Sequence, residues 1–491
     1  MPTRKVSIAE VMDHSGVAFG TSGARGLVTA MTDEVCYTYT RGFLQYLERE
    51  RELERGGQVA VAGDLRSSTG RIMRAVMKAI ADYGSVPVNG GRVPSPAVAL
   101  YGFDKRIPSI MVTGSHIPDD RNGIKFNRPT SELLKKDEPG MKEQVVELPA
   151  DFDAKGATLA AVQRAEPALE PALEERYVRR YFEAFGEGAL SGARIGLFEH
   201  SAVGRDICFK VLRGLGAQVT RLGRSDAFIP VDTEAIRPED IASAARWAQE
   251  NDFDSIVSTD GDSDRPLVSD EHGKWLRGDI AGILTAEFLG ATFVATPVSC
   301  NTAVEKCGAF ARVARTRIGS PYVIEAMNGA LGGSEKVVGY EANGGFLTAT
   351  DFSFAGRLPA LATRDALLVQ LAVLLSARAQ RTSISKLLAA LPQRFTASDR
   401  LEDFPTALSK ERLGALAQGG AAAIEKEFPD FGKVVEVSNI DGLRITFASD
   451  EIVHLRPSGN APELRCYTEA ASEARALKLN EEALSVLRGW R

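Results

Sequence analysis

The sequence is poor in cysteine and lacks a long apolar run, and both absences limit what the protein can be. Its 491 residues include five cysteines at wide spacings, without a Cys-x-x-Cys pair. This argues against a disulfide framework or a zinc site and favours free thiols in a reducing compartment. The N-terminal segment lacks the apolar core of a signal peptide. The most apolar later stretches, 283–298 and 367–375, are interrupted by Glu287 or too short to cross a bilayer. We therefore expect a cytoplasmic protein without a membrane partner.

An excess of basic side chains is also missing. The chain has 59 Lys and Arg against 65 Asp and Glu, a formal net charge of −6. Nucleic-acid binding favours a basic face, and contact with anionic membranes favours a basic cluster. We expect neither partner, whereas an anionic small molecule could bind where positive groups gather locally. The length indicates several domains, because single cores rarely exceed about 250–300 residues.

Apolar runs of strand length alternate with amphipathic helical stretches over the first three quarters of the chain. Strands are expected in three successive rounds, at 58–64, 86–88 and 109–113, then at 194–198, 218–222 and 255–258, then at 292–296, 312–318 and 336–340. The hydroxyl side chains at 67–69 are expected to cap the helix after the first strand. Alternating β and α segments predict largely parallel sheets with helices on both faces, and ligand sites in the loops after the carboxyl ends of strands.

The C-terminal part of the chain follows a different pattern. A helix is expected at 471–487, after four short strands at 433–437, 442–447, 451–455 and 463–468. This order predicts a smaller α+β domain with an antiparallel sheet. We therefore predict an α/β protein with four domains, at 1–160, 161–275, 276–387 and 388–491.

The first polar loop is TGSHIP, which continues to the segment NGIK at 122–125. A serine in such a loop can act as a nucleophile when its proton has an acceptor and its charge is compensated. Ser115 has His116 beside it and Lys125 further along the chain, so these three are candidate catalytic residues. The alternative is a hydroxyl-containing turn that only ends a strand.

The second polar loop is DGDSDR at 260–265. Three carboxylates at alternate positions can converge on one hard cation, and Mg²⁺ prefers such oxygen ligands. The candidate ligands are Asp260, Asp262 and Asp264. An EF-hand is disfavoured, because Arg265 stands where that loop needs a glycine. A solvated acidic loop is the other alternative, but three like charges this close repel one another.

Three further glycine-rich segments could recognise a sugar phosphate, although each could also be a plain turn. In YEANGG, the side chains of Glu341 and Asn343 could bind sugar hydroxyls beside Gly344. In FGTSGARG, Arg25 could reach a phosphate, and the segment matches neither a P-loop nor a dinucleotide fingerprint. In RPSGNAP, an arginine, a hydroxyl, an amide and backbone N–H groups could cradle a phosphate. The candidates there are Arg456, Ser458, Gly459 and Asn460.

Taken together and in this order, the five segments resemble the α-D-phosphohexomutase family. TGSHIP is similar to the phosphoserine loop of that family, DGDSDR to its metal loop, YEANGG to its sugar loop and RPSGNAPELR to its phosphate loop. FGTSGARG is similar to its opening segment. The resemblance covers nearly the whole chain. It implies three similar α/β domains with mixed or parallel sheets and a C-terminal α+β domain, arranged around one central cleft.

The resemblance also implies roles for the candidate residues. Ser115 would carry the phosphoryl group, and an oxygen of that group would bind Mg²⁺ together with Asp260, Asp262 and Asp264. Arg25 and Lys125 would stabilise charge or handle protons near the phosphoserine, and Arg265 would help to bind the substrate. The sugar loop would read hydroxyls, and the phosphate loop would hold the phosphate that does not react.

The implied reaction moves a phosphoryl group between C1 and C6 of a hexose phosphate through a bisphosphorylated sugar, with hexose 1,6-bisphosphate as activator. The segment GSHIPDDRNGIKF favours a phosphomannomutase. Phosphoglucomutase or phospho(acetyl)glucosamine mutase are alternatives, because Gly345 replaces the family's usual histidine and Asn343 its serine. A sugar-phosphate phosphatase and a non-catalytic sugar-phosphate sensor are rivals of other classes. We expect a monomer or homodimer whose partner is a small hexose phosphate.

Overall fold

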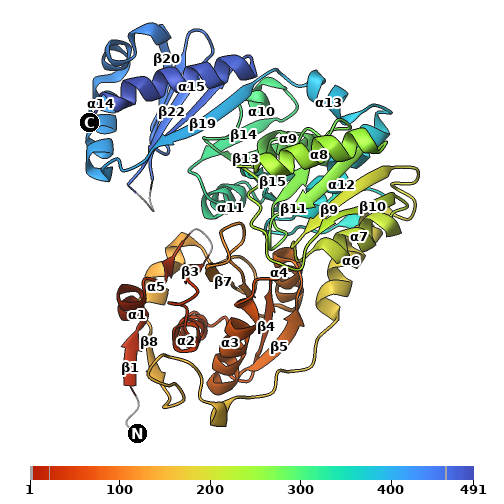
Figure 1. Ribbon diagram of the computed structural model, residues 1–491, viewed down its shortest axis with the longest axis vertical. Coiled ribbons are helices and arrows are strands. Elements are labelled where there is room, and N and C mark those ends of the chain that lie inside the picture. Colours follow the sequence, from red (N-terminus) through yellow and green to blue (C-terminus); the bar gives the residue numbers. More distant parts are fainter. Residues whose placement is uncertain (1–3, 21–22, 459–461) are drawn as a thin grey trace. The chain divides into compact units, whose positions relative to one another are not determined.

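The structure is a computed structural model that describes residues 4–20, 23–458 and 462–491. The chain forms two compact units, and Figure 1 colours it from the N-terminus to the C-terminus. The first unit comprises the chain up to Gly290 together with Asn343–Ser385, and the second comprises Ala291–Ala342 together with Lys386–Arg491. Within the described ranges, no helix combines the length and apolar character needed to cross a bilayer. All five cysteines are free thiols, and four of them are buried.

The first unit begins with a mixed sheet. Its strands are β2 (Ala18–Phe19), β3 (Ala24–Leu27), β4 (Gln58–Gly63), β5 (Val86–Gly91), β6 (Ser109–Val112) and β7 (Arg121–Asn127). They lie in the order β2-β3-β7-β6-β4-β5, and β4 pairs in parallel with both β5 and β6. β6 is wholly buried and apolar apart from its first residue, as expected for a strand covered on both faces.

The same part of the first unit also contains helices and a small two-stranded sheet. The helices are α1 (Ile8–Ser15), α2 (Asp33–Arg49), α3 (Thr69–Tyr83), α4 (Ser95–Lys105) and α5 (Glu138–Lys142). The small sheet pairs β1 (Arg4–Ser7) with β8 (Val145–Leu148). α4 packs on β4 and β6, and α2 packs on α3. The TGSHIP loop begins at the carboxyl end of β6.

The rest of the first unit contains a second mixed sheet. Its strands are β9 (Arg194–His200), β10 (Gln218–Arg224), β11 (Ser255–Thr259) and β12 (Pro266–Val268), in the order β10-β9-β11-β12. β9, β10 and β11 are parallel, and β12 returns antiparallel after the acidic loop. The helices are α6 (Ala172–Phe185), α7 (Arg205–Gly214), α8 (Pro238–Glu250), α9 (Gly278–Leu289) and α12 (Ala366–Ala379). Three short strands are β16 (Phe346–Thr348), β17 (Phe352–Ser353) and β18 (Arg357–Leu358).

The second unit contains a parallel and an antiparallel part. In the parallel part, β13 (Phe293–Pro297) pairs with β14 (Arg312–Thr316) and β15 (Val337–Tyr340), beside α10 (Ala303–Lys306) and α11 (Ser320–Gly329). The strands of the antiparallel sheet are β19 (Phe395–Leu401), β23 (Leu464–Ala470), β22 (Ile452–Pro457), β21 (Leu443–Phe447) and β20 (Val434–Ser438), in that order. The remaining helices are α13 (Ile384–Ala390), α14 (Thr406–Glu427) and α15 (Glu473–Arg488).

The predicted fold class is confirmed in its secondary structure. The three rounds of strands and helices form mixed and parallel sheets, and the C-terminal strands form an antiparallel sheet. The helix expected at 471–487 corresponds to α15. The four domain boundaries stay a prediction.

Two local expectations were wrong. The segment 122–125, interpreted above as part of a loop, belongs to β7, which pairs with β6 and places Lys125 opposite Met111. The hydroxyls at 67–69 make no capping hydrogen bond to α3, and two of them bind other side chains instead. Ser68 Oγ accepts a hydrogen bond from Asn122 Nδ2 at 2.8 Å, and Thr69 Oγ1 donates one to an Asp64 oxygen at 2.6 Å.

Candidate active site

Ser115 lies just beyond β6 in a backbone conformation that serine rarely adopts. Its φ is +58°, in the left-handed region, which costs a non-glycine residue about 1–2 kcal/mol. The residue is fully buried, and its Oγ donates a hydrogen bond to Asp260 Oδ2 at 2.7 Å. The structure thus brings the predicted nucleophile directly against the predicted metal loop.

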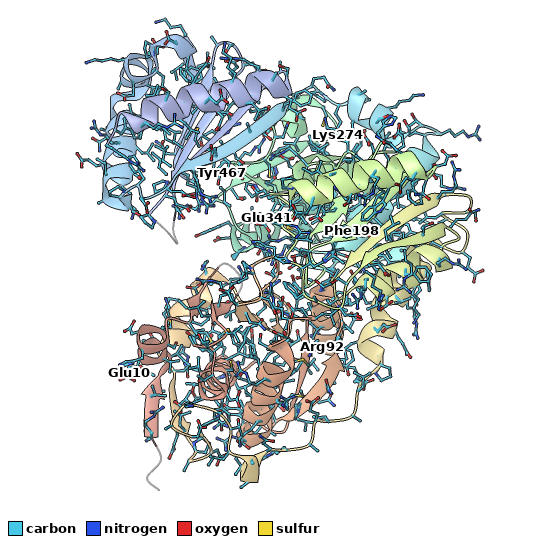
Figure 2. The ribbon with its side chains drawn as sticks, in the orientation of Figure 1. Glu10, Arg92, Phe198, Lys274, Glu341 and Tyr467 are labelled. Carbon is cyan, nitrogen blue, oxygen red and sulfur yellow. The ribbon has the colours of Figure 1, made fainter. Side chains whose placement is uncertain are left out.

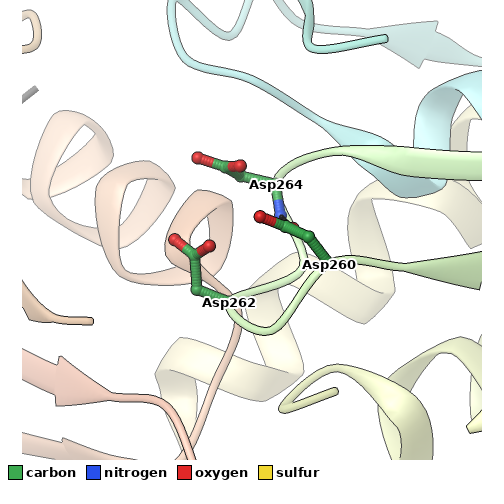
Figure 3. Close-up of side chains that lie close together, drawn as sticks. All are labelled: Asp260, Asp262 and Asp264. Carbon is green, nitrogen blue, oxygen red and sulfur yellow. Dashed lines mark hydrogen bonds between the residues drawn. The ribbon is translucent and has the colours of Figure 1, made fainter. Parts of the chain in front are cut away.

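The acidic loop gathers three buried carboxylates between β11 and β12 (Figure 3). Asp260, Asp262 and Asp264 each offer one oxygen, and these oxygens lie within 4.8 Å of one another. Among the described residues, Asp262 Oδ1 and Asp264 Oδ1 are buried without a hydrogen-bond partner. Buried unpaired carboxylate oxygens are costly, and an oxygen-ligated cation satisfies them. The group could therefore hold a metal ion.

Two basic side chains partly neutralise these carboxylates. Lys125 Nζ lies 2.5 Å from Asp262 Oδ2 and 2.7 Å from Asp264 Oδ2. Arg364 Nη2 lies 3.1 Å from the same oxygen of Asp264 and is 3% exposed. Ser95, at the start of α4, also donates a hydrogen bond to Asp262.

The three carboxyl groups consequently titrate differently. Burial, with Asp262 and Asp264 nearby, raises the pKa of Asp260 well above its usual value. Burial also opposes ionisation of Asp262, but the Lys125 ammonium outweighs it and holds the pKa of that carboxyl below its usual range. Burial is likewise outweighed at Asp264, where Arg364 lowers the pKa. Asp260 is thus the group most in need of an added positive charge.

His116 and Arg265 form a pair beside the serine. His116 Nδ1 lies 3.0 Å from Arg265 Nη1 and 3.3 Å from Ser115 Oγ. Burial and the Arg265 guanidinium lower the pKa of His116 to about 4. The imidazole is therefore neutral near pH 7, and Nδ1 accepts the hydrogen bond from Arg265 while Nε2 faces Asp232 at 3.9 Å.

Arg25 lies on β3, whose partner β7 carries Lys125. In the register of these strands Arg25 is opposite Gly123. Burial and the neighbouring Arg265 lower the pKa of Arg25 to about 10, and Asp262 attracts the guanidinium. Arg25 thus contributes positive charge to the same site.

The sugar loop is divided between the two units. In the first unit, Asn343 Oδ1 accepts a hydrogen bond from Gly345 N at 2.9 Å, and its backbone oxygen accepts one from Thr233 Oγ1 at 2.7 Å. Gly344 has a φ of +86°, and a Cβ there would lie 3.0 Å from two Pro266 ring carbons. In the second unit, Glu341 is buried at the end of β15 (Figure 2).

The phosphate loop lies in the second unit, at the end of β22. Arg456 Nε donates a hydrogen bond to Asp441 Oδ1 at 2.9 Å, and the Ser458 backbone N–H donates one to the Glu463 backbone oxygen at 2.8 Å. The predicted phosphate ligands Gly459 and Asn460 lie outside the described residues.

Sequence reasoning missed several buried residues that contact these loops. They are Asp64, Arg66, Ser95 and Arg364. The signal available for two of them was a carboxylate and an arginine directly after β4, a position where parallel sheets place functional groups. No local sequence pattern distinguishes Arg364 from the other arginines of the chain.

Solved structures of other proteins define the fold. A phosphoglucomutase/phosphomannomutase family protein from Burkholderia thailandensis superposes with a TM-score of 0.75, at 19% identity, covering 97% of this chain and 98% of that one. The Aspergillus fumigatus N-acetylphosphoglucosamine mutase, solved in complex with GlcNAc-6P and magnesium, superposes with a TM-score of 0.59, at 15% identity, covering 99% of both chains. The fold is therefore that of a phosphohexomutase.

Sequence comparisons identify the family to which the chain belongs. Profiles of phosphoglucomutase/phosphomannomutase match the chain at residues 16–147 (alpha/beta/alpha domain I), 277–395 (alpha/beta/alpha domain III) and 408–486 (C-terminal domain). A phosphomannomutase of Sinorhizobium fredii is 43% identical, covering 96% of this chain and 99% of its own. A phosphomannomutase of Salmonella muenchen is 41% identical, covering 97% and 96%. The chain belongs to the phosphoglucomutase/phosphomannomutase family, as its motifs predicted, and is thus a phosphohexomutase.

Proposed function

We propose that this phosphohexomutase moves a phosphoryl group reversibly between C1 and C6 of a hexose phosphate, with Ser115 as the carrier. The observation that supports this most is the 2.7 Å hydrogen bond from Ser115 Oγ to Asp260, inside a buried acidic cluster. A hydroxyl buried against a possible metal site is suited to phosphoryl transfer, which depends on positioning and charge neutralisation.

In the first half-reaction, the bond between phosphorus and Ser115 Oγ breaks and a bond to the free sugar hydroxyl forms. The proton lost by that hydroxyl is balanced by the one that Ser115 Oγ gains. The bisphosphorylated sugar then turns in the site and returns its other phosphoryl group to Ser115. Lys125 and Arg25 would supply positive charge near the transferring group, and neutral His116, which accepts a hydrogen bond from Arg265, would hold that guanidinium beside Ser115.

The acidic loop fits Mg²⁺ as cofactor. Its donors are oxygens, and two of them, Asp262 Oδ1 and Asp264 Oδ1, have no hydrogen-bond partner within the described part of the chain. Asp260, Asp262 and Asp264 would hold the ion, together with an oxygen of phosphorylated Ser115. When bound, Mg²⁺ would neutralise part of the negative charge on the transferring phosphoryl group.

Mannose phosphates are the proposed substrates, since the two relatives that are 43% and 41% identical are named phosphomannomutases. Arg265, Glu341, Asn343 and Gly344 would bind the sugar, and Arg456 and Ser458, with Gly459 and Asn460, the phosphate that does not react. A hexose 1,6-bisphosphate would act as activator by restoring phospho-Ser115. We propose a cytoplasmic monomer or homodimer.

The experiment measures phosphorylation and turnover together. Wild-type protein is incubated with mannose 1,6-bisphosphate, and intact mass spectrometry should detect one added phosphoryl group. Ser115→Ala should take up none and lose turnover by at least about 10³-fold, while the control Ser398→Ala, an exposed serine on β19, should match the wild type. Near-normal turnover of Ser115→Ala would refute the covalent route.

Substrate choice and the rival activity are tested in one assay. Mannose, glucose and N-acetylglucosamine 1-phosphates are offered side by side with a trace of the matching bisphosphate. The highest kcat/KM should belong to mannose 1-phosphate. Stoichiometric release of inorganic phosphate instead of the 6-phosphate would identify a phosphatase.

A further inference from the structure

Arg66, in the loop after β4, has a fully buried guanidinium whose hydrogen-bonding capacity is used completely. An arginine side chain has five N–H donors. Nε donates to Asp64 Oδ2 at 3.2 Å. The other four N–H groups donate to backbone oxygens of the TGSHIP loop (residues 113–118, the nucleophile loop) and of the first residue of β7. The distances are 2.8 Å for Ser115, 2.5 Å for Ile117, 2.7 Å for Pro118 and 3.1 Å for Arg121. One side chain therefore holds the chain at the serine itself and at three positions after it.

Asp64 connects this guanidinium to the other backbone group of the serine. Its Oδ2 accepts a hydrogen bond from Thr113 Oγ1 at 2.7 Å, and Thr113 Oγ1 in turn accepts one from the Ser115 backbone N–H at 2.7 Å. Arg92, labelled in Figure 2, donates to the Asp64 backbone oxygen at 2.7 Å. The N–H and the C=O of Ser115 are thus both held by a network centred on the Asp64–Arg66 pair.

The guanidinium of Arg66 is closely packed on two sides. A Cβ at Gly114 would lie 2.7 Å from Arg66 Cζ and 2.8 Å from Nε. On another side, the guanidinium carbon lies 4.0 Å from the centre of the Phe228 ring. Phe228 also lies close to the backbone of Gly261, in the acidic loop. Arg66 is therefore enclosed between the backbone of the nucleophile loop and a ring that adjoins the acidic loop.

Ser115 needs such support, because its left-handed φ of +58° is unfavourable for a side chain with a Cβ. Strained backbone of this kind persists only where the surrounding structure determines it. We propose that Arg66 is the positioning residue of the reaction, a planar clamp on four carbonyl groups that holds Ser115 Oγ at Asp260. This inference rests on the proposed function of Ser115 and adds to it the residue that sets the geometry of the nucleophile.

The test compares two substitutions that disturb the clamp in different ways. Arg66→Lys keeps the positive charge, but the lysine ammonium has three N–H donors and lacks the planar forked geometry of a guanidinium. Gly114→Ala keeps Arg66 but places a methyl group against its guanidinium. The matched control is Arg315→Lys in the second unit, because Arg315 binds Glu305 and three backbone carbonyl groups far from Ser115 in sequence. Those oxygens belong to Pro297, Cys300 and Asn301.

Steady-state kinetics with mannose 1-phosphate should separate positioning from folding. We expect kcat of Arg66→Lys to fall about 100-fold with KM changed less than about threefold, because a displacement of about 1 Å at the reacting atom costs that much. Gly114→Ala should lower kcat at least tenfold in the same pattern, and Arg315→Lys should keep kcat within about twofold. The rate at which each protein takes up phosphoryl from mannose 1,6-bisphosphate should fall in parallel with kcat.

The outcomes are distinguishable. If Arg66→Lys keeps kcat within about threefold, or Arg315→Lys loses as much as Arg66→Lys, the clamp is refuted. If Arg66→Lys does not fold, judged by circular dichroism, Gly114→Ala alone decides, and a wild-type kcat in that variant refutes the clamp. Ser115→Ala is measured beside them, because its retained turnover would refute the proposed function itself, whatever Arg66→Lys does.

Discussion

Gly345 and Arg364 lie so close together that a Cβ at position 345 would be 2.4 Å from Arg364 Cδ and 2.8 Å from its Cγ. Arg364 is 3% exposed and reaches the Asp264 carboxylate. The missing side chain at 345, which distinguishes this sugar loop from the motif it resembles, therefore has a physical reason. A larger residue at position 345 would collide with Arg364 in its present position.

Gly345→Ala should displace Arg364 and leave Asp264 with Lys125 at 2.7 Å and Arg265 at 3.8 Å as its basic partners among the described contacts. Overpacking a buried site costs about 1–3 kcal/mol, so the urea midpoint should fall, and kcat/KM should fall about tenfold or more with it. Gly329→Ala, where a Cβ would meet nothing within 4 Å, is the control and should change neither quantity appreciably. Unchanged activity and stability in Gly345→Ala would show that Arg364 is not held in this way.

Lys125→Met should reveal how strongly the acidic loop depends on its internal cation. Lys125 bridges Asp262 and Asp264, and removing one partner of a buried ion pair typically costs about 3–5 kcal/mol. In EDTA, the free energy of unfolding should fall by about that amount. Added Mg²⁺ should restore more stability to the variant than it adds to the wild type, because it binds the folded state and replaces the missing charge.

The control for this experiment is a second bridging lysine. Lys78 Nζ lies 2.8 Å from Asp82 Oδ2 and 2.6 Å from Asp151 Oδ2, and neither carboxylate belongs to the acidic triad found among the described residues. Lys78→Met should lose stability without any gain in its response to Mg²⁺. If both variants respond to Mg²⁺ equally, the cation is not bound by the loop that Lys125 supports.

The sequence predicted the parts of this site that are local in the chain. Apolar runs gave the positions of β4, β6 and β11, and the loops after them contain Ser115 and Asp260 as expected from the position of functional groups in parallel sheets. Arg364 could not be predicted, because its partner comes from a distant segment and no periodicity reports such pairing. The position after β4 was a signal for Arg66, but its contacts with the distant TGSHIP loop could not be predicted. Lys125 was predicted for its charge but was placed in a loop, since the polar NGIK segment conceals a strand that pairs with β6.

Arg456→Ala should raise KM about tenfold or more while kcat changes less than about threefold. The proposed role of Arg456 is to bind the phosphate that does not react, and such an interaction contributes equally to the ground state and the transition state. The structure orients the side chain through Asp441 at 2.9 Å. Arg475→Ala, whose guanidinium pairs with Glu451 and Glu482 on the same domain, is the matched control and should leave KM unchanged. A fall in kcat at constant KM would instead place Arg456 at the reacting end.

Acid should destabilise the second unit through His454 on β22. Burial lowers the pKa of His454 to about 4, while its Nε2 contacts the Asp441 backbone oxygen at 2.6 Å. The unfolded chain has a histidine pKa of about 6.5, so below that pH it binds a proton that the folded state refuses. Stability therefore falls as pH drops from about 6.5 to about 4, and this group causes no further change below that range. The loss at pH 5 is about 2 kcal/mol.

Urea unfolding of His454→Gln at pH 7.5 and pH 5 should show a pH-dependent loss of stability that is smaller than that of the wild type by this amount. The exposed-histidine variant His14→Gln should keep the full acid sensitivity of the wild type. An equal loss in all three proteins would mean that His454 is protonated in the folded state.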